Sequence, residues 1–267
     1  MVGHDTRITS IKMTQILESN YKNLLVSGCS FTHNNYETPC TWANSFAVWA
    51  GMSITNLAIP GAGNTHIKNS IILWLEQNKP NPDDLLILIM WSGVERIDWI
   101  TGKDQSKFSD QYPFSYDYTN ECELTLGGSW WANTPKTHLT KILKEYSKYQ
   151  CNQSLSLSSW LAMTDLTNYL NQHGYTYYYT AYQNLWHDGY KSNQWINYGN
   201  ELEKMNLILP MTKWLFTEPD KFLGNFTKTH GKLWDDGFHP SREGHEHWAT
   251  EILVPALIEK NVIWKMQ

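Results

Sequence analysis

The sequence predicts an α/β fold on a parallel sheet, and three observations support this prediction. Short apolar segments alternate with helix-like segments three times within about 70 residues, the pattern of βαβ units. The segment 84–91 (DLLILIMW) is almost continuously apolar, as in a parallel strand covered on both faces. Turn residues close the earlier strand candidates, at Gly28 and at the PGAG sequence of 60–63. We therefore expect a doubly wound sheet with helices on both faces.

The first part of the chain carries the clearest elements. Apolar residues at positions 67, 71, 72 and 75 recur at helical spacing, and Pro80 and Pro82 stop that helix. The elements expected there are a strand at Asn23–Ser27, a helix at 39–49 with Thr38 as N-cap candidate and Gly51 past its end, a strand at 53–59, a helix at Asn64–Asn78 and a strand at 84–91.

The second part is less regular, and we expect a single domain over 1–267 with aromatic-rich insertions at about 101–134 and 184–200. Long irregular segments in compact domains are often functional. The other elements expected there are helices at 135–149 and 154–172, a strand at 175–182, a helix at 201–216 broken at Pro210, and a last helix from Ser241 to about 259, kinked or divided at Pro255.

Composition excludes several classes of protein. The chain has 21 basic and 26 acidic residues, a net charge of −5 and no Lys/Arg block, so neither a nucleic-acid nor a membrane partner is expected. No apolar stretch reaches the ~18 residues of a membrane span, and no apolar signal region is present at the start. The cytoplasm is the default location, or a place in a larger assembly. Four cysteines without C-x-x-C spacing are expected to be reduced thiols.

Ligands of open α/β sheets bind beyond the carboxyl ends of the strands. Four segments should meet there: 28–32, 60–64, 91–93 and 235–240. They supply a serine hydroxyl, an imidazole, a carboxylate and flexible backbone amides.

Three of these side chains form a potential catalytic set. Ser30 follows the first strand, where a tight turn would expose its Oγ beside backbone N–H groups. Asp236 precedes His239 by three residues, so a short turn would let the carboxylate orient the imidazole toward a serine. Each feature alone also has an ordinary explanation as a turn or surface residue.

Together, the motifs GCSFT, NLAIPGAGNT and DGFHPSREGH resemble those of the SGNH (GDSL-like) hydrolases, in matching order over residues 23 to 255. The resemblance implies a flavodoxin-like, three-layer α/β/α fold and ester hydrolysis through an acyl-serine, with no metal or organic cofactor. It implies Ser30 as nucleophile, His239 as general base and Asp236 as its orienting residue. The backbone N–H groups of Ser30 and Gly61 would bind the oxyanion.

The chain departs from the family pattern at two places. Cys29 replaces the usual Asp of G-D-S; as an alternative nucleophile it is disfavoured, because neighbours in an extended segment point opposite ways. Val94 stands where the family's G-x-N-D motif places an oxyanion-binding Asn. The replacement candidates are Asn64, our first choice, Ser92 and Arg96. Asn64 could instead cap the following helix, and Arg96 could pair with Glu95 or Asp98.

Two other kinds of site are not expected. His239, His245 and His247 cluster in sequence, but the last two do not share a helix face, so no metal site is expected. The turn at 61–63 lacks the G-x-G-x-x-G and G-K-[ST] patterns of phosphate loops.

The sequence therefore predicts a serine esterase that cleaves a small acyl ester through acyl-Ser30. Tyr and Trp at 112–131 and 175–198 suggest an O-acetyl carbohydrate, although such residues also fill cores and oligomer interfaces. The alternatives are a non-catalytic glycan-binding or structural component of a larger assembly, and an acyltransferase using the same triad. Specificity would lie in 95–134 and 182–235, and the oligomeric state is left open.

Overall fold

The computed structural model describes residues 17–34, 41–94, 96–102, 115–117, 122–127, 145, 152–183, 185 and 211–266. Thr38, most of the helix expected at 135–149 and most of the insertions at 101–134 and 184–200 lie outside these residues, as does 201–210.

The centre of the fold is a parallel four-stranded sheet. Its strands are β2 (Asn23–Ser27), β3 (Ser53–Asn56), β4 (Leu85–Trp91) and β8 (Thr176–Ala181), in the order β3-β2-β4-β8. Asn23 pairs with Ser53 on one side and Leu85 on the other, so three strands start level. All seven residues of β4 are buried, as the continuous apolar run predicts. The α/β prediction is confirmed.

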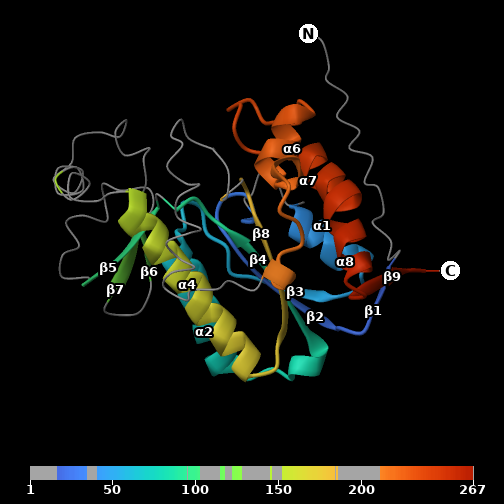
Figure 1. Ribbon diagram of the computed structural model, residues 1–267, viewed down its shortest axis with the longest axis horizontal. Helices are drawn as coiled ribbons and strands as arrows, with labels where there is room; N and C mark the ends of the chain where they lie inside the picture. Colours follow the sequence, from blue (N-terminus) through green and yellow to red (C-terminus); the bar gives the residue numbers. More distant parts are fainter. Residues whose placement is uncertain are drawn as a thin grey trace, which may run out of the picture.

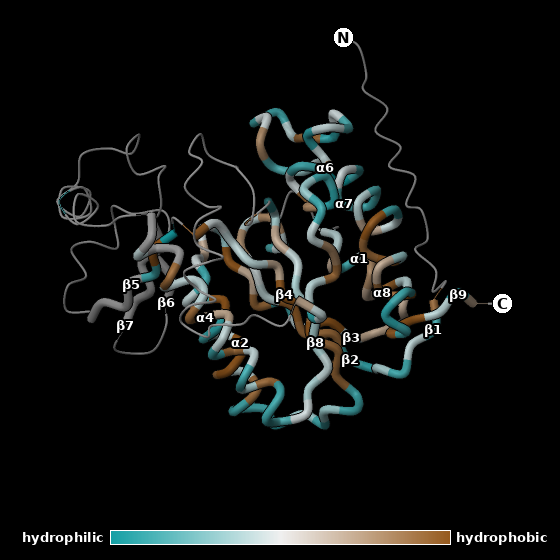
Figure 2. Tube along the Cα trace, in the orientation of Figure 1, coloured by the Kyte–Doolittle hydropathy of each residue, from teal (hydrophilic) through white to brown (hydrophobic). Residues whose placement is uncertain are grey.

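Helices cover both faces of the sheet, which makes three layers (Figure 1). On one face α2 (Asn64–Asn78) packs against α4 (Asn152–Gln172), with an ion pair of 3.2 Å between Lys68 Nζ and Asp165 Oδ2. On the other face lie α1 (Trp42–Trp49), α7 (Arg242–Trp248) and α8 (Val254–Glu259), where the rings of Trp42 and Trp248 meet edge to face. Hydrophobic colour concentrates on the central strands (Figure 2). The core thus lies where sheet and helices meet.

Several boundaries differ from the sequence prediction. The α2 helix has the bounds predicted, whereas α1 begins at Trp42, three residues later than expected. The β3 strand ends at Asn56 instead of continuing to 59, because the Ala58 N–H turns back onto the Asn56 side chain. Two short 3-10 turns, Pro82–Asp84 and Pro219–Lys221, were not predicted, nor was α6 (Leu223–Thr229).

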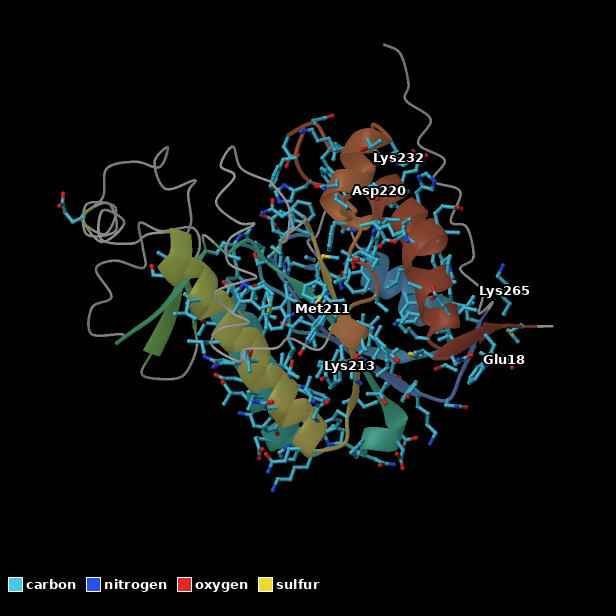
Figure 3. All side chains as sticks on the ribbon, in the orientation of Figure 1. Glu18, Met211, Lys213, Asp220, Lys232 and Lys265 are labelled. Carbon is cyan, nitrogen blue, oxygen red and sulfur yellow. The ribbon has the colours of Figure 1, made fainter. Side chains whose placement is uncertain are left out.

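The described end of the helix expected at 201–216 is not an α-helix. Only Met211–Lys213 form a 3-10 turn, after which Trp214 bridges in parallel to Tyr179 of β8 and extends the sheet edge. The Leu215 N–H donates to the Tyr179 carbonyl at 3.0 Å. Lys213, labelled in Figure 3, places its Nζ 4.5 Å from the centre of the Tyr177 ring. Pairing to β8 therefore replaces helix in this segment.

The last helix is divided, as Pro255 predicts. Ser241 caps α7, its Oγ accepting from the Gly244 N–H, and a π-helical turn over Ala249–Leu253 leads into α8. Pro255 lies in the first turn of α8. Because proline has no N–H to donate, the wider turn falls where an ordinary helical hydrogen bond would be missing.

Two antiparallel sheets were not predicted. One pairs β1 (Leu17–Ser19) with β9 (Ile263–Lys265), joining opposite ends of the sequence. The other has the order β5-β7-β6, from Ile97–Gly102, Cys122–Gly127 and Ser115–Asp117 respectively. Strands β6 and β7 lie within the segment 101–134 that was expected to be irregular, and β5 begins just before it. Among the described residues, no helix is long and apolar enough to span a membrane.

The pH dependence of stability should reflect His66 in α2. Its side chain is buried, neither ring nitrogen has a hydrogen-bond partner among the described residues, and burial lowers the pKa to about 4 from 6.5. Between these two pKa values only the unfolded chain binds a proton at His66. The contribution of His66 to the free energy of unfolding is therefore fully present above pH 6.5, and it is lost as the pH decreases toward 4. His66 contributes about 1.4 kcal/mol per pH unit to the slope of stability against pH in this range.

We expect the free energy of unfolding of His66→Leu, measured by denaturant titration at pH 4.5–8, to depend less steeply on pH than that of wild type. The difference in slope should correspond to one proton. Comparison at pH 8 separates the packing change from the titration. An unchanged slope would mean that His66 does not contribute.

Candidate active site

A tight turn after β2 exposes Ser30. The N–H groups of Thr32 and His33 both donate to the Cys29 carbonyl, at 2.9 and 3.0 Å. Gly28 makes the turn possible, since a Cβ there would lie 2.5 Å from Thr32 Oγ1. The turn leaves Ser30 partly exposed while Cys29 is fully buried in the apolar core. The Cys29 thiol therefore cannot reach a substrate.

The second component is the turn that precedes α7. The Asp236 Oδ1 accepts from the backbone N–H groups of Phe238 and His239, at 2.8 and 2.9 Å. The Trp234 N–H donates to the His239 carbonyl, and Gly237 adopts a φ of 68° that favours glycine. One carboxylate thus shapes the turn and holds His239 at its end.

Ser30, His239 and Asp236 form one hydrogen-bonded chain. Asp236 Oδ2 lies 2.6 Å from His239 Nδ1, and His239 Nε2 lies 2.9 Å from Ser30 Oγ. Because an ionised carboxylate can only accept, Nδ1 carries a hydrogen and donates it. In the neutral ring Nε2 then carries the lone pair that accepts the serine hydroxyl. The structure brings these three predicted side chains together in the order a serine hydrolase needs.

The environment of Asp236 keeps it ionised. Burial alone would raise the pKa of Asp236. The hydrogen bonds from the His239 ring and from the N–H groups of Phe238 and His239 outweigh burial, so the pKa of Asp236 is held below its usual range. Its side chain is 48% exposed and that of His239 is 38% exposed, so the pair is open to solvent. The carboxylate therefore remains an acceptor for the His239 Nδ1–H at neutral pH.

Backbone amides lie at the two neighbouring strand ends. Ser30 begins the turn after β2, and Gly61, at a φ of 84°, occupies the loop after β3. Within the described part of the chain, no hydrogen bond from either N–H is found. The two loops are joined by His33, whose Nδ1 lies 2.8 Å from the Ala58 carbonyl, and by the Asn56 side chain, which donates to the Thr32 carbonyl.

Asn64 has partners other than the oxyanion that we expected. Its Oδ1 accepts from the Ser92 N–H at 2.8 Å, and its Nδ2 donates to the Ser92 carbonyl at 3.1 Å. Nor is Asn64 the helix N-cap, which is Gly63. The side chain is 2% exposed and joins the start of α2 to the end of β4. It therefore holds two site loops together.

Asp98 of β5 fixes the same loop from the other side. Its carboxylate accepts from the N–H groups of Gly63 and His66, at 2.7 and 2.8 Å, at the positive end of the α2 dipole. Burial raises the pKa of Asp98, and these N–H groups and the nearby positive charge of Arg96 partly oppose that effect, in line with the expected pairing of Arg96 with Asp98. The sequence predicts Asp98 only as a possible partner of Arg96, and it does not predict the contacts with α2. No local pattern pairs a β5 residue with a helix 30 residues earlier.

The loop after β4 lacks an amide side chain at the expected point. Val94 is 5% exposed and belongs to the apolar core. Ser92 is fully buried. Arg96 reaches back toward the Gly61 loop, with Nη1 3.4 Å from the Ala62 carbonyl. Its guanidinium carbon lies 5.4 Å from the centre of the Tyr182 ring.

Aromatic rings lie beside His239 and the Ser30 turn. Phe31 stacks on Tyr182 with centroids 4.5 Å apart and lies 5.2 Å from the His239 ring. Phe238 is 46% exposed and meets both Phe31 and His239 edge to face. A hollow of about 360 Å³ lies beside the Ser30 turn, lined by His33, Asn34, Asn56, Leu57, Ala58 and Ile59. The site thus combines apolar ring surface with a nearby hollow of small-molecule size.

The two histidines of α7, His245 and His247, have different surroundings. His245 is buried, and burial, with a smaller effect from His239, lowers its pKa to about 3. The His247 ring packs against Phe226 and His230 instead. In the described residues, no group of three or more His, Cys, Asp or Glu could hold a metal ion.

Sequence comparison identifies the family. A model described as a family of unknown function, DUF6071, matches residues 30–265, which begin at Ser30 and include all of the candidate site. The chain belongs to the DUF6071 family. No curated protein matches it in sequence.

Three solved structures are among those that this DUF6071 member resembles. The psychrotrophic esterase EstA from Pseudoalteromonas sp., in a structure inhibited by monoethylphosphonate, is 10% identical with a TM-score of 0.46, over 90% of this chain and 98% of that one. TesA is 13% identical with a TM-score of 0.44, over 88% and 98%. A G-D-S-L family lipolytic protein from Veillonella parvula is 11% identical with a TM-score of 0.46, over 89% and 96%.

The Asp98 contacts predict a stability effect. Asp98→Asn keeps the shape but turns an N–H donor toward backbone donors, and we expect it to lower the free energy of unfolding by about 1–3 kcal/mol. Asp165→Asn, which removes only the solvent-exposed pair with Lys68, should cost less than about 1 kcal/mol. Denaturant unfolding measures both variants. Equal, small losses would contradict the part assigned to Asp98.

Proposed function

We propose that this protein is a serine esterase that hydrolyses small acyl esters through an acyl-Ser30 intermediate. The observation that carries the proposal is the chain of hydrogen bonds from Asp236 through His239 to Ser30, of 2.6 and 2.9 Å. The three side chains come from two turns, and Ser30 is 209 residues away from His239 in the sequence. The Gly61 loop is joined to the Ser30 turn through His33 and Asn56. A general base that already touches its nucleophile is the geometry of nucleophilic catalysis.

In the first half-reaction His239 Nε2 takes the Ser30 hydroxyl proton as Oγ bonds to the ester carbonyl carbon. The carbonyl oxygen becomes an oxyanion near the N–H groups of Ser30 and Gly61. The C–O bond to the alcohol then breaks, and His239 gives that alcohol its proton. Asp236 holds the ring and stabilises its charge. In the second half, water loses a proton to His239, attacks the acyl carbon and releases the acid and free Ser30.

The surroundings of Ser30 favour a small ester with a ring-bearing alcohol. The exposed Phe238 ring offers an apolar face beside His239, and aromatic faces of this kind stack on sugar rings. The hollow, whose lining includes His33 three residues after Ser30, offers space for a small group next to the nucleophile turn. We take O-acetyl carbohydrates as the first substrate class to test.

Labelling with a fluorophosphonate probe tests the nucleophile, since Ser30 Oγ would displace fluoride to form a stable phosphonyl ester. We expect wild type to be labelled, Ser30→Ala to be unlabelled and Cys29→Ala to be labelled like wild type. Labelling of Ser30→Ala at the wild-type rate would remove Ser30 from the role.

Turnover of acetyl esters tests the orienting carboxylate. Asp236→Asn should lower kcat by about 10⁴-fold, the scale seen when a serine triad loses this group. Asp235→Asn, which changes the neighbouring carboxylate, is the matched control and should retain most activity. Similar losses in both variants would mean that the turn, and not the Asp236 contact, was disturbed.

A second candidate is a non-catalytic glycan-binding protein, and the buried Val94 in place of an oxyanion-binding amide favours it. Wild type would then bind acetylated glycans without releasing acetate and would resist the probe. Transfer of the acetyl group to an added sugar in preference to water would indicate the acyltransferase.

A further inference from the structure

The oxyanion position lacks one donor of the expected set. With Val94 buried in the core, two backbone N–H groups, from Ser30 and Gly61, are left to bind the negative charge that forms during attack. One missing donor of this type typically lowers kcat by about 10²–10³-fold. A productive esterase with this site therefore needs another donor nearby.

The structure separates the three candidates that the sequence offers. Asn64 is held on the Ser92 backbone through both its oxygen and its nitrogen. Ser92 is fully buried, with an enclosed Oγ. Arg96 is half-buried at the start of β5, and its long side chain returns toward the loop that carries Gly61.

Two contacts place the Arg96 guanidinium at the candidate site. Nη1 lies 3.4 Å from the carbonyl of Ala62, the residue after Gly61. The guanidinium carbon lies 5.4 Å from the centre of the Tyr182 ring, which stacks on Phe31, the residue after Ser30. The guanidinium thus contacts the residue that follows Gly61 and a ring that stacks on the residue that follows Ser30.

Asp98 gives this position rigidity. It follows Arg96 by two residues, and its carboxylate binds the N–H groups of Gly63 and His66. Residues 96–98 therefore contact the segment that follows Gly61 in two ways. The Asp98 carboxylate accepts from backbone N–H groups, and the Arg96 guanidinium donates to the Ala62 carbonyl. A guanidinium presents five N–H groups in a fixed plane, so contact with Ala62 is compatible with a further hydrogen bond.

We propose that Arg96 is the third, cationic donor to the oxyanion, replacing the amide side chain that Val94 cannot supply. This inference rests on the proposed esterase function. The charge that develops on the substrate oxygen would be met by a guanidinium N–H as well as by the Ser30 and Gly61 amides. The contact strengthens as the oxyanion forms, so it acts on kcat more than on KM.

The test is acetyl-ester kinetics of Arg96→Ala and Arg96→Lys. We expect Arg96→Ala to lose about 10²–10³-fold in kcat with KM changed less than about threefold. Arg96→Lys, which keeps the charge but not the planar fork, should lie between it and wild type. Millimolar guanidinium chloride, below denaturing concentrations, should restore part of the Arg96→Ala activity and none of that of Ser30→Ala.

Two comparisons exclude a purely structural effect. Arg242→Ala, at an exposed position of α7, is the arginine control and should keep wild-type kcat without any response to guanidinium. Asp98→Asn loosens the same loop, and a structural role for Arg96 predicts that the two variants respond alike, with lowered melting temperature and no rescue. If Arg96→Ala fails to fold, Arg96→Gln provides the same comparison with a neutral, hydrogen-bonding side chain.

The outcomes are distinct. Wild-type kcat in Arg96→Ala, a change confined to KM, or a loss that guanidinium does not restore would overturn the role of Arg96, while Ser30 labelling would still support the esterase. A wild-type protein that neither reacts with the fluorophosphonate nor hydrolyses any ester would overturn the proposed function, and the Arg96 inference with it.

Discussion

The parallel pairing of β2 with β3 on one side and β4 on the other is the constraint on which the candidate site depends. Asn23 is level with both Ser53 and Leu85, so the three strands run in step. Their carboxyl ends therefore deliver the Ser30 turn, the Gly61 loop and the loop after β4 to one edge. Complete burial of β4 on both faces keeps it at the centre of the sheet, between β2 and β8.

Polar contacts between the loops convert that register into a defined site. Asn64 joins α2 to the Ser92 backbone, Asp98 holds the α2 amides, and His33 joins the first loop to Ala58. These groups are buried or half-buried, where an unmatched polar atom is costly, so each contact also selects one loop conformation. His239 is held separately, by a turn that the Asp236 carboxylate organises.

Much of the fold and the central part of the candidate site could be predicted from the sequence. The Asn23–Ser27, Asn64–Asn78 and 84–91 elements follow from apolar periodicity and turn residues, and Ser30, Asp236 and His239 follow from motif order. The part of Asp98 could not be predicted, because its contacts join β5 to a helix far away in sequence. Asn64 was assigned to the oxyanion because sequence order does not reveal that the Ser92 backbone lies beside it. The pairing of β1 with β9 was missed for the same reason.

The sequence by itself determined which side chains this protein can use: one serine after the first strand, one D-x-x-H turn, and Val94 where an amide was expected. It also determined the alternation of strands and helices, because that pattern is local and periodic. Only the tertiary structure decided which groups meet. It decided that His239 Nε2 faces Ser30, that Cys29 lies in the core and that Arg96 returns to the Gly61 loop. Such contacts depend on strand order and loop packing, which bring distant residues within hydrogen-bonding distance.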